Sequence, residues 1–273
     1  MNKKRFDHHI HSSFSYDAGP DCTIGAIIEA ALAKGLDGIA VTDHLDPLWP
    51  DDSDPSWLDV PAYEKGLDEA EATNAANAGR LLFSKGIELG FIPGEALEIC
   101  EEAVSAYPYD FVLGSVHSSA TTPIELPPFV EGRGLRDIID EYYRILLDSI
   151  RVYKNFDVLG HINGIDRYTD GFADESLYMP YADEILRILV AGGKGLEVNM
   201  SSIRYNIAER GTPTLAILRR FKELGGEIVT LGSDAHSLAG VGEGLEQGEE
   251  LIRAAGFRHI AFFTQRRPEF YAL

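Results

Sequence analysis

Short apolar runs and longer amphipathic stretches alternate along almost the whole chain. The first amphipathic stretch, TIGAIIEAALAKG at residues 23–35, spaces its apolar side chains three and four residues apart, which is typical of a helix with one buried face. The apolar runs, such as DGIAVTDH at 37–44, have the length and composition of strands buried on both faces. The predicted strands are residues 5–10, 37–44, 80–90, 110–117, 157–162, 195–200, 226–236 and 259–264, and the predicted helices are residues 23–35, 62–79, 94–106, 135–154, 180–191, 212–224 and 244–255.

This alternation predicts an α/β fold. Buried strands that are separated by helices form parallel sheets. Seven clear strand–helix units and an eighth apolar run, in 273 residues, fit a closed β/α barrel better than an open doubly wound sheet, which stays as the alternative. The glycine motifs of nucleotide-binding folds are absent from the sequence. Because the sequence also shows no repeat and no linker, we expect a single domain over residues 1–273.

The charge balance narrows the range of partners. Asp and Glu number 44 against 24 Lys and Arg, a formal net charge of −20. Such a surface disfavours nucleic acids and anionic lipids, whereas bound metal ions can reverse the field locally for a small anionic substrate. No pattern in the sequence indicates an oligomeric state.

The sequence also favours a cytoplasmic protein. It contains no run of about 18 apolar residues that could span a membrane. The start, MNKKRFDHH, lacks the apolar stretch of a secretory signal. Cys22 and Cys100 suggest no disulfide framework, and we expect two reduced, buried thiols.

Six of the eight histidines fall at the carboxyl ends of predicted strands. In a β/α barrel these ends converge on one face. Since residues two apart in a strand share a side, His9 and His11 are expected to point together, as are Asp234 and His236, while His8 is expected outside the barrel. The candidates at the strand ends are His9, His11, His44, Glu88, His117, His161, Asp234 and His236.

This clustering indicates metal binding. Buried imidazoles without a ligand would be costly unsatisfied polar groups, and divalent cations bind imidazole in its neutral form. So many candidate ligands exceed the needs of one tetrahedral ion and suit two or three ions that share carboxylate and water ligands. Imidazole and carboxylate ligands fit Zn, Fe or Mn. Such a cluster can produce a hydroxide near neutral pH and support in-line displacement at phosphorus.

The ordered motifs DHHIHSSFSYD, GIAVTDH, GIELG, GSVH, LGHIN and LGSDAH resemble those of the polymerase-and-histidinol-phosphatase (PHP) superfamily, and most closely its histidinol-phosphate phosphatases. The resemblance runs from residue 6 to about residue 240 and implies a distorted (β/α)7 barrel with three metal positions. Asp17 stands where many members have a histidine. The implied ligands are His9, His11, Glu88 and Asp234 for the first metal, Glu88, His117 and His161 for the second, and Asp17, His44 and His236 for the third.

The same resemblance implies an activity. Arg167 and Arg204 follow two of the strands, and similar arginines in the histidinol phosphatases grip the substrate phosphate, which a guanidinium can bind with two hydrogen bonds. We therefore expect hydrolysis of L-histidinol phosphate to L-histidinol and phosphate, in histidine biosynthesis, by a metal-bridging hydroxide. The expected catalytic residues are Arg167, Arg204, Asp234 and His236, and the expected phosphate-binding residues are Arg167, Arg204 and His117.

Further roles are expected around the leaving group. His236, His44 or a metal-bound water would protonate the leaving alkoxide. Asp43, Asp46 or other acidic residues of the long loop 45–61 would attract the ammonium and imidazole groups of the substrate. This loop and loop 118–134 each follow a strand that ends in histidine and could cover the site.

Three other functions stay open. A phosphodiesterase or nucleotide phosphatase could use the same metal site. A related amidohydrolase would bridge its metals with a carboxylated lysine, whereas this sequence offers Glu88 at the end of its strand and Lys85 before the end. A metal store or regulatory module would bind ions without turnover.

Overall fold

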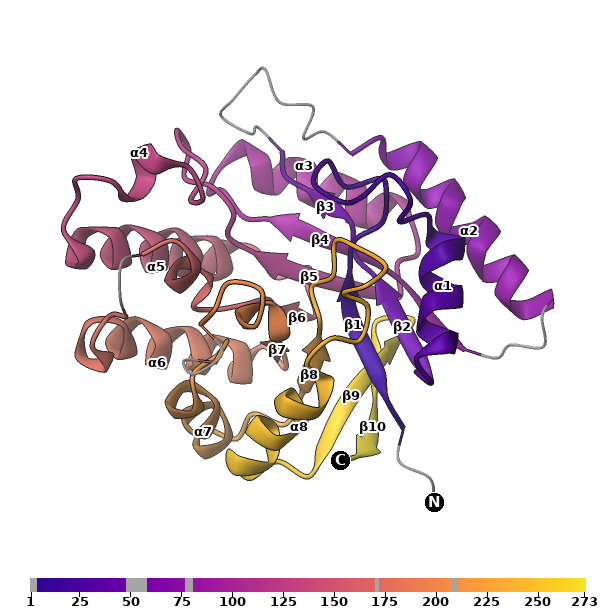
Figure 1. Ribbon diagram of the computed structural model, residues 1–273. Helices are drawn as coiled ribbons and strands as arrows, with labels where there is room; N and C mark the ends of the chain where they lie inside the picture. The colour runs from indigo at the N-terminus through magenta and orange to yellow at the C-terminus, as the bar shows by residue number, and fades with distance from the viewer. Residues whose placement is uncertain (1–3, 48–57, 77–80, 170–171, 208–210) are drawn as a thin grey trace.

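The computed structural model is a barrel of seven parallel strands with helices around it (Figure 1). It describes residues 4–47, 58–76, 81–169, 172–207 and 211–273. A short strand, β3 (His44–Leu45), pairs with the carboxyl-terminal half of β4. In their order around the barrel, the strands are β1 (Phe6–Ile10), β2 (Gly38–Val41), β4 (Leu82–Gly90), β5 (Phe111–Ser115), β6 (Val158–Leu159), β7 (Gly195–Asn199) and β8 (Val229–Gly232).

Strands β1 and β8 close the barrel through only two backbone hydrogen bonds. The N–H of Asp234 donates to the carbonyl of His9 at 2.8 Å, and the N–H of His11 donates to the carbonyl of Ala235 at 2.9 Å. This seam confirms the predicted distorted (β/α)7 barrel and excludes the open doubly wound sheet.

The predicted helices all form, with some shifted boundaries. Thr23 caps the first helix as expected, since its hydroxyl accepts a hydrogen bond from the N–H of Ala26. The cap of α7 is Thr214, so this helix begins later than predicted, and α6 begins earlier because Asp174 caps it. The helices are α1 (Ile24–Ala33), α2 (Val60–Ala76), α3 (Glu95–Ala106), α4 (Pro127–Val130), α5 (Leu135–Val152), α6 (Glu175–Ala191), α7 (Leu215–Glu223) and α8 (Leu245–Ala254), with 3-10 turns η1 (Gly164–Arg167) and η2 (Met200–Ser202).

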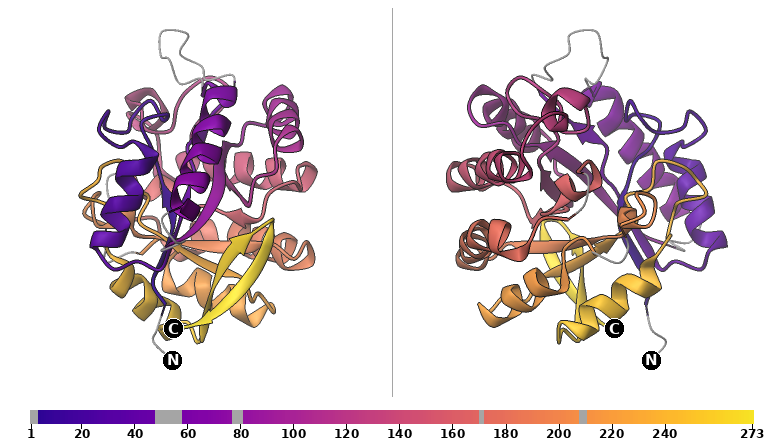
Figure 2. Two further views of the ribbon diagram at one scale, coloured as in Figure 1. Left: turned by 90° about the vertical axis from the view of Figure 1, so that its right-hand side faces the viewer. Right: turned by 60° about the vertical axis from the view of Figure 1, so that its left-hand side comes forward.

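The last apolar run is not a barrel strand. Strand β9 (His259–Thr264) pairs antiparallel with β10 (Arg267–Ala272), and this hairpin lies against the end of the barrel where β1 and β2 begin (Figure 2). Its side chains fill the base of the barrel, because Ala261 and Phe263 form one apolar cluster with Phe111 and other strand residues. The base is therefore closed, and the opposite face carries the polar side chains.

A register shift in β1 between Asp7 and Ile10 changes which side chains face inward. The ring of His8 lies 6.0 Å from that of Phe111, on the other side of the barrel, while its neighbour His9 reaches Glu197 inside the same barrel. The prediction that His8 lies outside is wrong, because a bulge interrupts the strict alternation of a regular strand.

Two other predictions are tested within the described residues. Cys22 and Cys100 are free and buried, as expected. Among the described helices, none has the length and apolar character needed to cross a membrane.

Candidate metal centre

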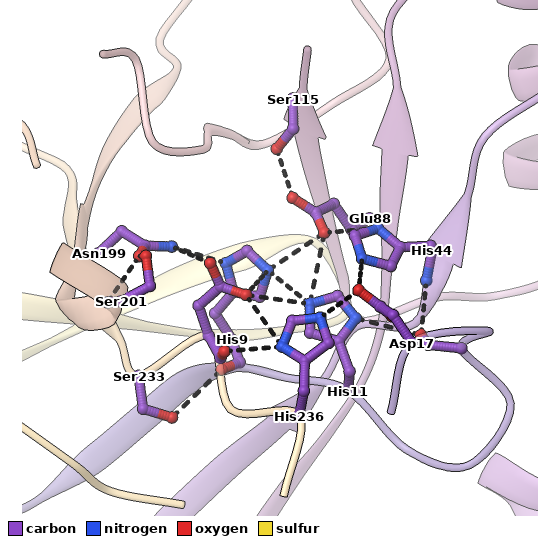
Figure 3. A network of polar contacts seen from close by, with 12 residues as sticks. His9, His11, Asp17, His44, Glu88, Ser115, Asn199, Ser201, Ser233 and His236 are labelled. Carbon is purple, nitrogen blue, oxygen red and sulfur yellow. Dashed lines mark hydrogen bonds and ion pairs between the residues drawn. The ribbon is translucent and has the colours of Figure 1, made fainter. Parts of the chain in front are cut away.

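The carboxyl ends of the strands bring the predicted ligands together in one cluster, of which Figure 3 labels His9, His11, Asp17, His44, Glu88 and His236. Its imidazoles come from β1, from β3 and from the segments that follow β1, β5, β6 and β8. All nine predicted ligands lie in it: His9, His11, Asp17, His44, Glu88, His117, His161, Asp234 and His236.

The first group of donor atoms surrounds a common point inside the barrel. His9 Nε2 and His11 Nε2 are 3.0 Å apart. Glu88 Oε2 lies 3.2 Å from the first nitrogen and 3.5 Å from the second, and Asp234 Oδ1 lies 3.7 and 3.4 Å from them. Donor atoms at about 2.1 Å from a tetrahedral ion lie about 3.4 Å from one another. The spacing of this group therefore fits one ion.

Glu88 presents its two oxygens to different groups. Oε2 faces the first group, while Oε1 lies 3.3 Å from His117 Nε2 and 3.1 Å from His161 Nε2. These two nitrogens are 3.5 Å apart, again the separation of ligands on one ion. The Ser115 hydroxyl donates to Oε1 at 2.6 Å and fixes the carboxylate. This geometry suits a carboxylate that bridges two ions.

The third group is more open. Asp17 Oδ2 lies 3.0 Å from His236 Nε2 and 3.8 Å from His44 Nε2. The rings of both histidines stack against His11, with centroids 4.1 and 4.2 Å away. The Asp17 side chain is 37% exposed, so an ion in this group would be nearest to solvent.

The charges of the cluster favour cation binding. Burial opposes ionisation of Glu88 and Asp234, yet His9 and the other cationic groups around them hold the pKa of each carboxyl well below its usual value. For His9, burial lowers the pKa, but Glu88, Glu197 and Asp234 outweigh it and raise the pKa well above its usual value. The metal-free cluster thus holds ionised carboxylates that raise the pKa of His9, His44 and His117, whereas burial and neighbouring cationic groups lower the pKa of His11 and His161. Divalent ions would replace the protons on the first three imidazoles.

Buried atoms without hydrogen bonds support the same interpretation. Among the described residues, His44 Nδ1, His161 Nδ1 and Asp46 Oδ2 are buried without a hydrogen-bond partner. Imidazole nitrogens and carboxylate oxygens, with no thiolate, make a donor set that fits Zn, Fe or Mn.

Both predicted arginines line a pocket at the open face of the cluster. Arg167 Nη2 donates to Asp234 Oδ2 at 2.9 Å and to Asn199 Oδ1 at 3.2 Å. Arg204 donates to the backbone carbonyls of Ser233 and Asp234. The pocket is lined by Tyr16, Asp17, His44, His117, Ile124, Glu125, His161, Gly164, Arg167, Tyr168, Arg204, Tyr205, Asp234 and His236.

Two predicted substrate contacts are wrong. Asp43 is fully buried and accepts hydrogen bonds from the backbone and hydroxyls of Ser12 and Ser15, so it holds the loop after β1. Asp46 is also buried and faces His117, and neither carboxylate lines the pocket. Residues 48–57 of the same loop lie outside the described residues. The acidic residue that does line the pocket is Glu125, from loop 118–134. Its position in that long loop after His117 was the only feature of the sequence that could have indicated this role.

Lys85 does not reach the cluster. Its ammonium group lies 3.1 Å from Asp68 and 3.0 Å from Glu71, two residues of α2 outside the barrel. A carboxylated lysine at this position could not bridge metals in the site, and the amidohydrolase alternative loses its support.

Sequence reasoning missed Glu197. Its Oε1 lies 2.6 Å from His9 Nδ1, and its Oε2 accepts hydrogen bonds from the N–H of His161 and from the amide of Asn199. The available signal was a charged residue in the middle of the apolar strand GLEVNM, because a buried carboxylate has to be paired.

The fold and site together define a class: β/α barrels that carry a cluster of histidines and carboxylates, able to hold several metal ions, at the carboxyl ends of their strands. Within this class the chain belongs to the PHP domain family, whose model matches residues 7–201.

Known proteins resemble almost the whole chain. A probable histidinol-phosphatase of Deinococcus radiodurans is 31% identical over 243 residues, which cover 86% of this chain and 88% of that protein. One of Clostridium acetobutylicum is 28% identical and covers 96% and 97%. The crystal structure of histidinol phosphate phosphatase from Lactococcus lactis, complexed with Zn, L-histidinol and phosphate, matches with a TM-score of 0.83 and 26% identity, over 97% of this chain and 99% of that one.

Proposed function

We propose that this protein is a histidinol-phosphatase, which hydrolyses L-histidinol phosphate to L-histidinol and phosphate in histidine biosynthesis. The observation that carries the proposal is the pair Arg167 and Arg204 beside a cluster whose donor spacing fits metal ions. The relatives named as histidinol-phosphatases, and a similar structure with Zn, L-histidinol and phosphate, support the same substrate.

Two or three divalent ions, Zn, Fe or Mn, would occupy the three groups of donor atoms. The shared Glu88 and the spacing of each group support this number. Zn in the similar structure favours zinc among the three elements. The proposed ligands are His9, His11, Glu88 and Asp234 for the first ion, Glu88, His117 and His161 for the second, and Asp17, His44 and His236 for the third.

The side chains of the chain would bind and orient the phosphate. Bound divalent ions supply charge neutralisation and an activated water at neutral pH. Arg167 is held by Asp234, so its guanidinium is oriented before substrate arrives, and Arg204 is fixed on two backbone carbonyls. Hydrogen bonds from these two groups, which are strongest in the transition state, would stabilise the charge on the phosphoryl oxygens.

Asp234 and His236 would contribute to catalysis by holding other groups of the site in place. Asp234 both faces the first group and orients Arg167. His236 Nδ1 donates to the carbonyl of Asp234 at 2.9 Å, which directs Nε2 toward Asp17. Both nitrogens of His236 are therefore engaged, which favours a role as ligand over a role as the acid for the leaving alkoxide.

Glu125 would recognise the cationic part of the substrate. Its carboxylate lines the pocket from the loop that follows His117. An ammonium or imidazolium group bound there would explain a preference for histidinol phosphate over a simple phosphate ester. The net charge of −20 supports a small substrate rather than a nucleic acid. We also propose that the chain works as one PHP domain, in the cytoplasm.

The test is turnover of a panel of compounds by zinc-loaded protein. L-histidinol phosphate, glycerol phosphate and a dinucleotide separate the proposed activity from a general phosphatase and from a phosphodiesterase. We expect phosphate release from L-histidinol phosphate with the highest kcat/KM, and loss of activity after removal of metal with a chelator. A higher kcat/KM on the dinucleotide, or full activity without metal, would contradict the proposal.

A further inference from the structure

Asp46 lies between two histidines that belong to different groups of the centre. Its Oδ1 is 2.7 Å from Nδ1 of His117, and its Oδ2 is 3.5 Å from Nδ1 of His44. The far nitrogens of these rings point elsewhere, since His117 Nε2 faces Glu88 and His161 while His44 Nε2 faces Asp17. Only the first of these two contacts is a hydrogen bond, because His44 Nδ1 and Asp46 Oδ2 have no hydrogen-bond partner among the described residues and His44 Nδ1 lies closer to Glu88 Oε2, at 3.1 Å.

The carboxylate sits in a space that the chain leaves open for it. Asp46 is 3% exposed and does not line the pocket, so it meets neither substrate nor bulk solvent. A Cβ atom on Gly90 would lie 1.8 Å from Asp46 Oδ1 and 3.2 Å from its Cα. Glycine at the end of β4 is therefore required for Asp46 to reach His117.

We propose that Asp46 is a positioning residue that sets the orientation and tautomer of His117, and so supports the second metal position. The inference rests on the proposed function, because it uses the ligand groups assigned there. A carboxylate that accepts a proton from Nδ1 keeps that proton on Nδ1 and leaves Nε2 free to bind metal. When this carboxylate is removed, the second position loses the support of its His117 ligand.

The geometry favours this role over direct ligation by Asp46. The separation of 2.7 Å between Oδ1 and His117 Nδ1 is that of a hydrogen bond, although both residues also belong, with His44, to a group that could hold an ion. If His117 bound an ion through Nδ1, its Nε2 would no longer serve the group that it forms with Glu88 and His161.

The experiment compares zinc binding by the wild type and by Asp46→Asn, using competition with a chromogenic chelator. Asparagine keeps the size of the side chain but loses its charge. We expect the wild type to bind zinc and the variant to bind one of its ions about 10- to 100-fold more weakly, as for other partners of metal-binding histidines, with the other ions unaffected. Thermal unfolding of the metal-free forms should be nearly equal, whereas a purely structural residue would lower the melting temperature and leave zinc affinity unchanged.

Glycine variants supply a matched control. Gly90→Ala would displace the Asp46 carboxylate without removing its charge and should reproduce the loss, while Gly25→Ala, whose new Cβ meets nothing within 4 Å, should not. In the zinc-loaded wild type, nitrogen-15 spectra of the imidazoles should show His117 protonated at Nδ1. Zinc bound at Nδ1 of His117, or equal zinc affinity in Asp46→Asn, would overturn the inference alone. Failure of the wild type to bind zinc would instead overturn the proposed function.

Discussion

The Glu197 carboxylate holds His9 from a strand on the other side of the barrel seam. Its Oε1 lies 2.6 Å from His9 Nδ1, and both side chains are essentially inaccessible to solvent. The hydrogen bond leaves His9 Nε2 as the atom that faces His11, Glu88 and Asp234. Glu197 therefore fixes the inward-facing nitrogen of the first group.

Glu197→Gln is expected to weaken zinc binding at this group. The amide cannot draw the Nδ1 proton as a carboxylate does, so affinity should fall about 10- to 100-fold. Chelator competition measures the change, and Glu227→Gln, at an exposed position, serves as the control. Unaltered zinc affinity would mean that Glu197 serves only the packing of β7 against β6.

Asp17→Ala should remove one ion and leave the others. Asp17 is the most exposed of the proposed ligands and contributes only to the third group. Elemental analysis after dialysis should show about one equivalent of zinc fewer per chain. Asp17→His, which supplies an imidazole at the same place, should restore that equivalent. A loss of all zinc in Asp17→Ala would contradict the separate third position.

Substitution of the arginines should slow hydrolysis to different extents. Arg167 is the more buried, with a side-chain exposure of 9% against 32% for Arg204. We expect Arg167→Ala to lower kcat/KM for L-histidinol phosphate by about 10²- to 10³-fold and Arg204→Ala by less. Arg167→Lys should recover little, because lysine lacks the planar pair of donors. Zinc content is measured alongside, and an unchanged kcat/KM in the double variant would exclude phosphate binding by this pair.

Glu125→Gln should change substrate preference. A partly exposed charge pair is worth up to about 1 kcal/mol, so KM for L-histidinol phosphate should rise about fivefold. The kinetic constants for glycerol phosphate, which carries no cation, should stay the same and provide the control. An equal rise in KM for both esters would show that Glu125 does not recognise the cationic group.

Arg266→Ala should destabilise the protein more at pH 8 than at pH 5.5. Burial raises the pKa of Asp157 and the hydrogen bond from Arg266, at 2.5 Å, lowers it, so loss of the arginine raises the pKa further. A carboxyl whose pKa is raised in the folded state binds its proton more tightly there, and stability is lost as pH rises from the unfolded value toward the folded one. The expected loss is about 2–3 kcal/mol at pH 8.

Urea unfolding at the two pH values measures this effect. Both pH values lie above the sequence pI of about 4.7, so the protein has a net negative charge in both measurements. Arg267→Ala, on an exposed neighbour, is the control. Equal destabilisation at both pH values would show that the ion pair with Asp157 does not dominate.

The barrel and the cluster could be predicted because their signals are regular. Apolar periodicity defines the strands and helices, and parallel strands bring the residues that follow them to one face. This rule alone is enough to predict that His9, His11 and Asp234 lie at the same face of the barrel. By contrast, His8 was misplaced because the bulge in β1 breaks the alternation, and a bulge has no reliable sequence signal.

The supporting carboxylates could not be predicted for another reason. Glu197 meets His9 across 188 residues of sequence, and Asp46 meets His117 across 71. Contacts of this range leave no periodic trace in a single sequence. The same holds for β9 and β10, since an apolar run predicts a buried strand but not whether it joins the barrel or covers its base.

The seam between β1 and β8 has a further consequence for the folded state. Its two hydrogen bonds come from His9, His11, Asp234 and Ala235, three of which are proposed ligands of the first ion. That ion would fasten the first and last strands to each other, so its binding free energy adds to the stability of the closed barrel. Hydrogen–deuterium exchange at the amides of His11 and Asp234 would then slow as zinc is added, because opening of the seam would require release of the ion.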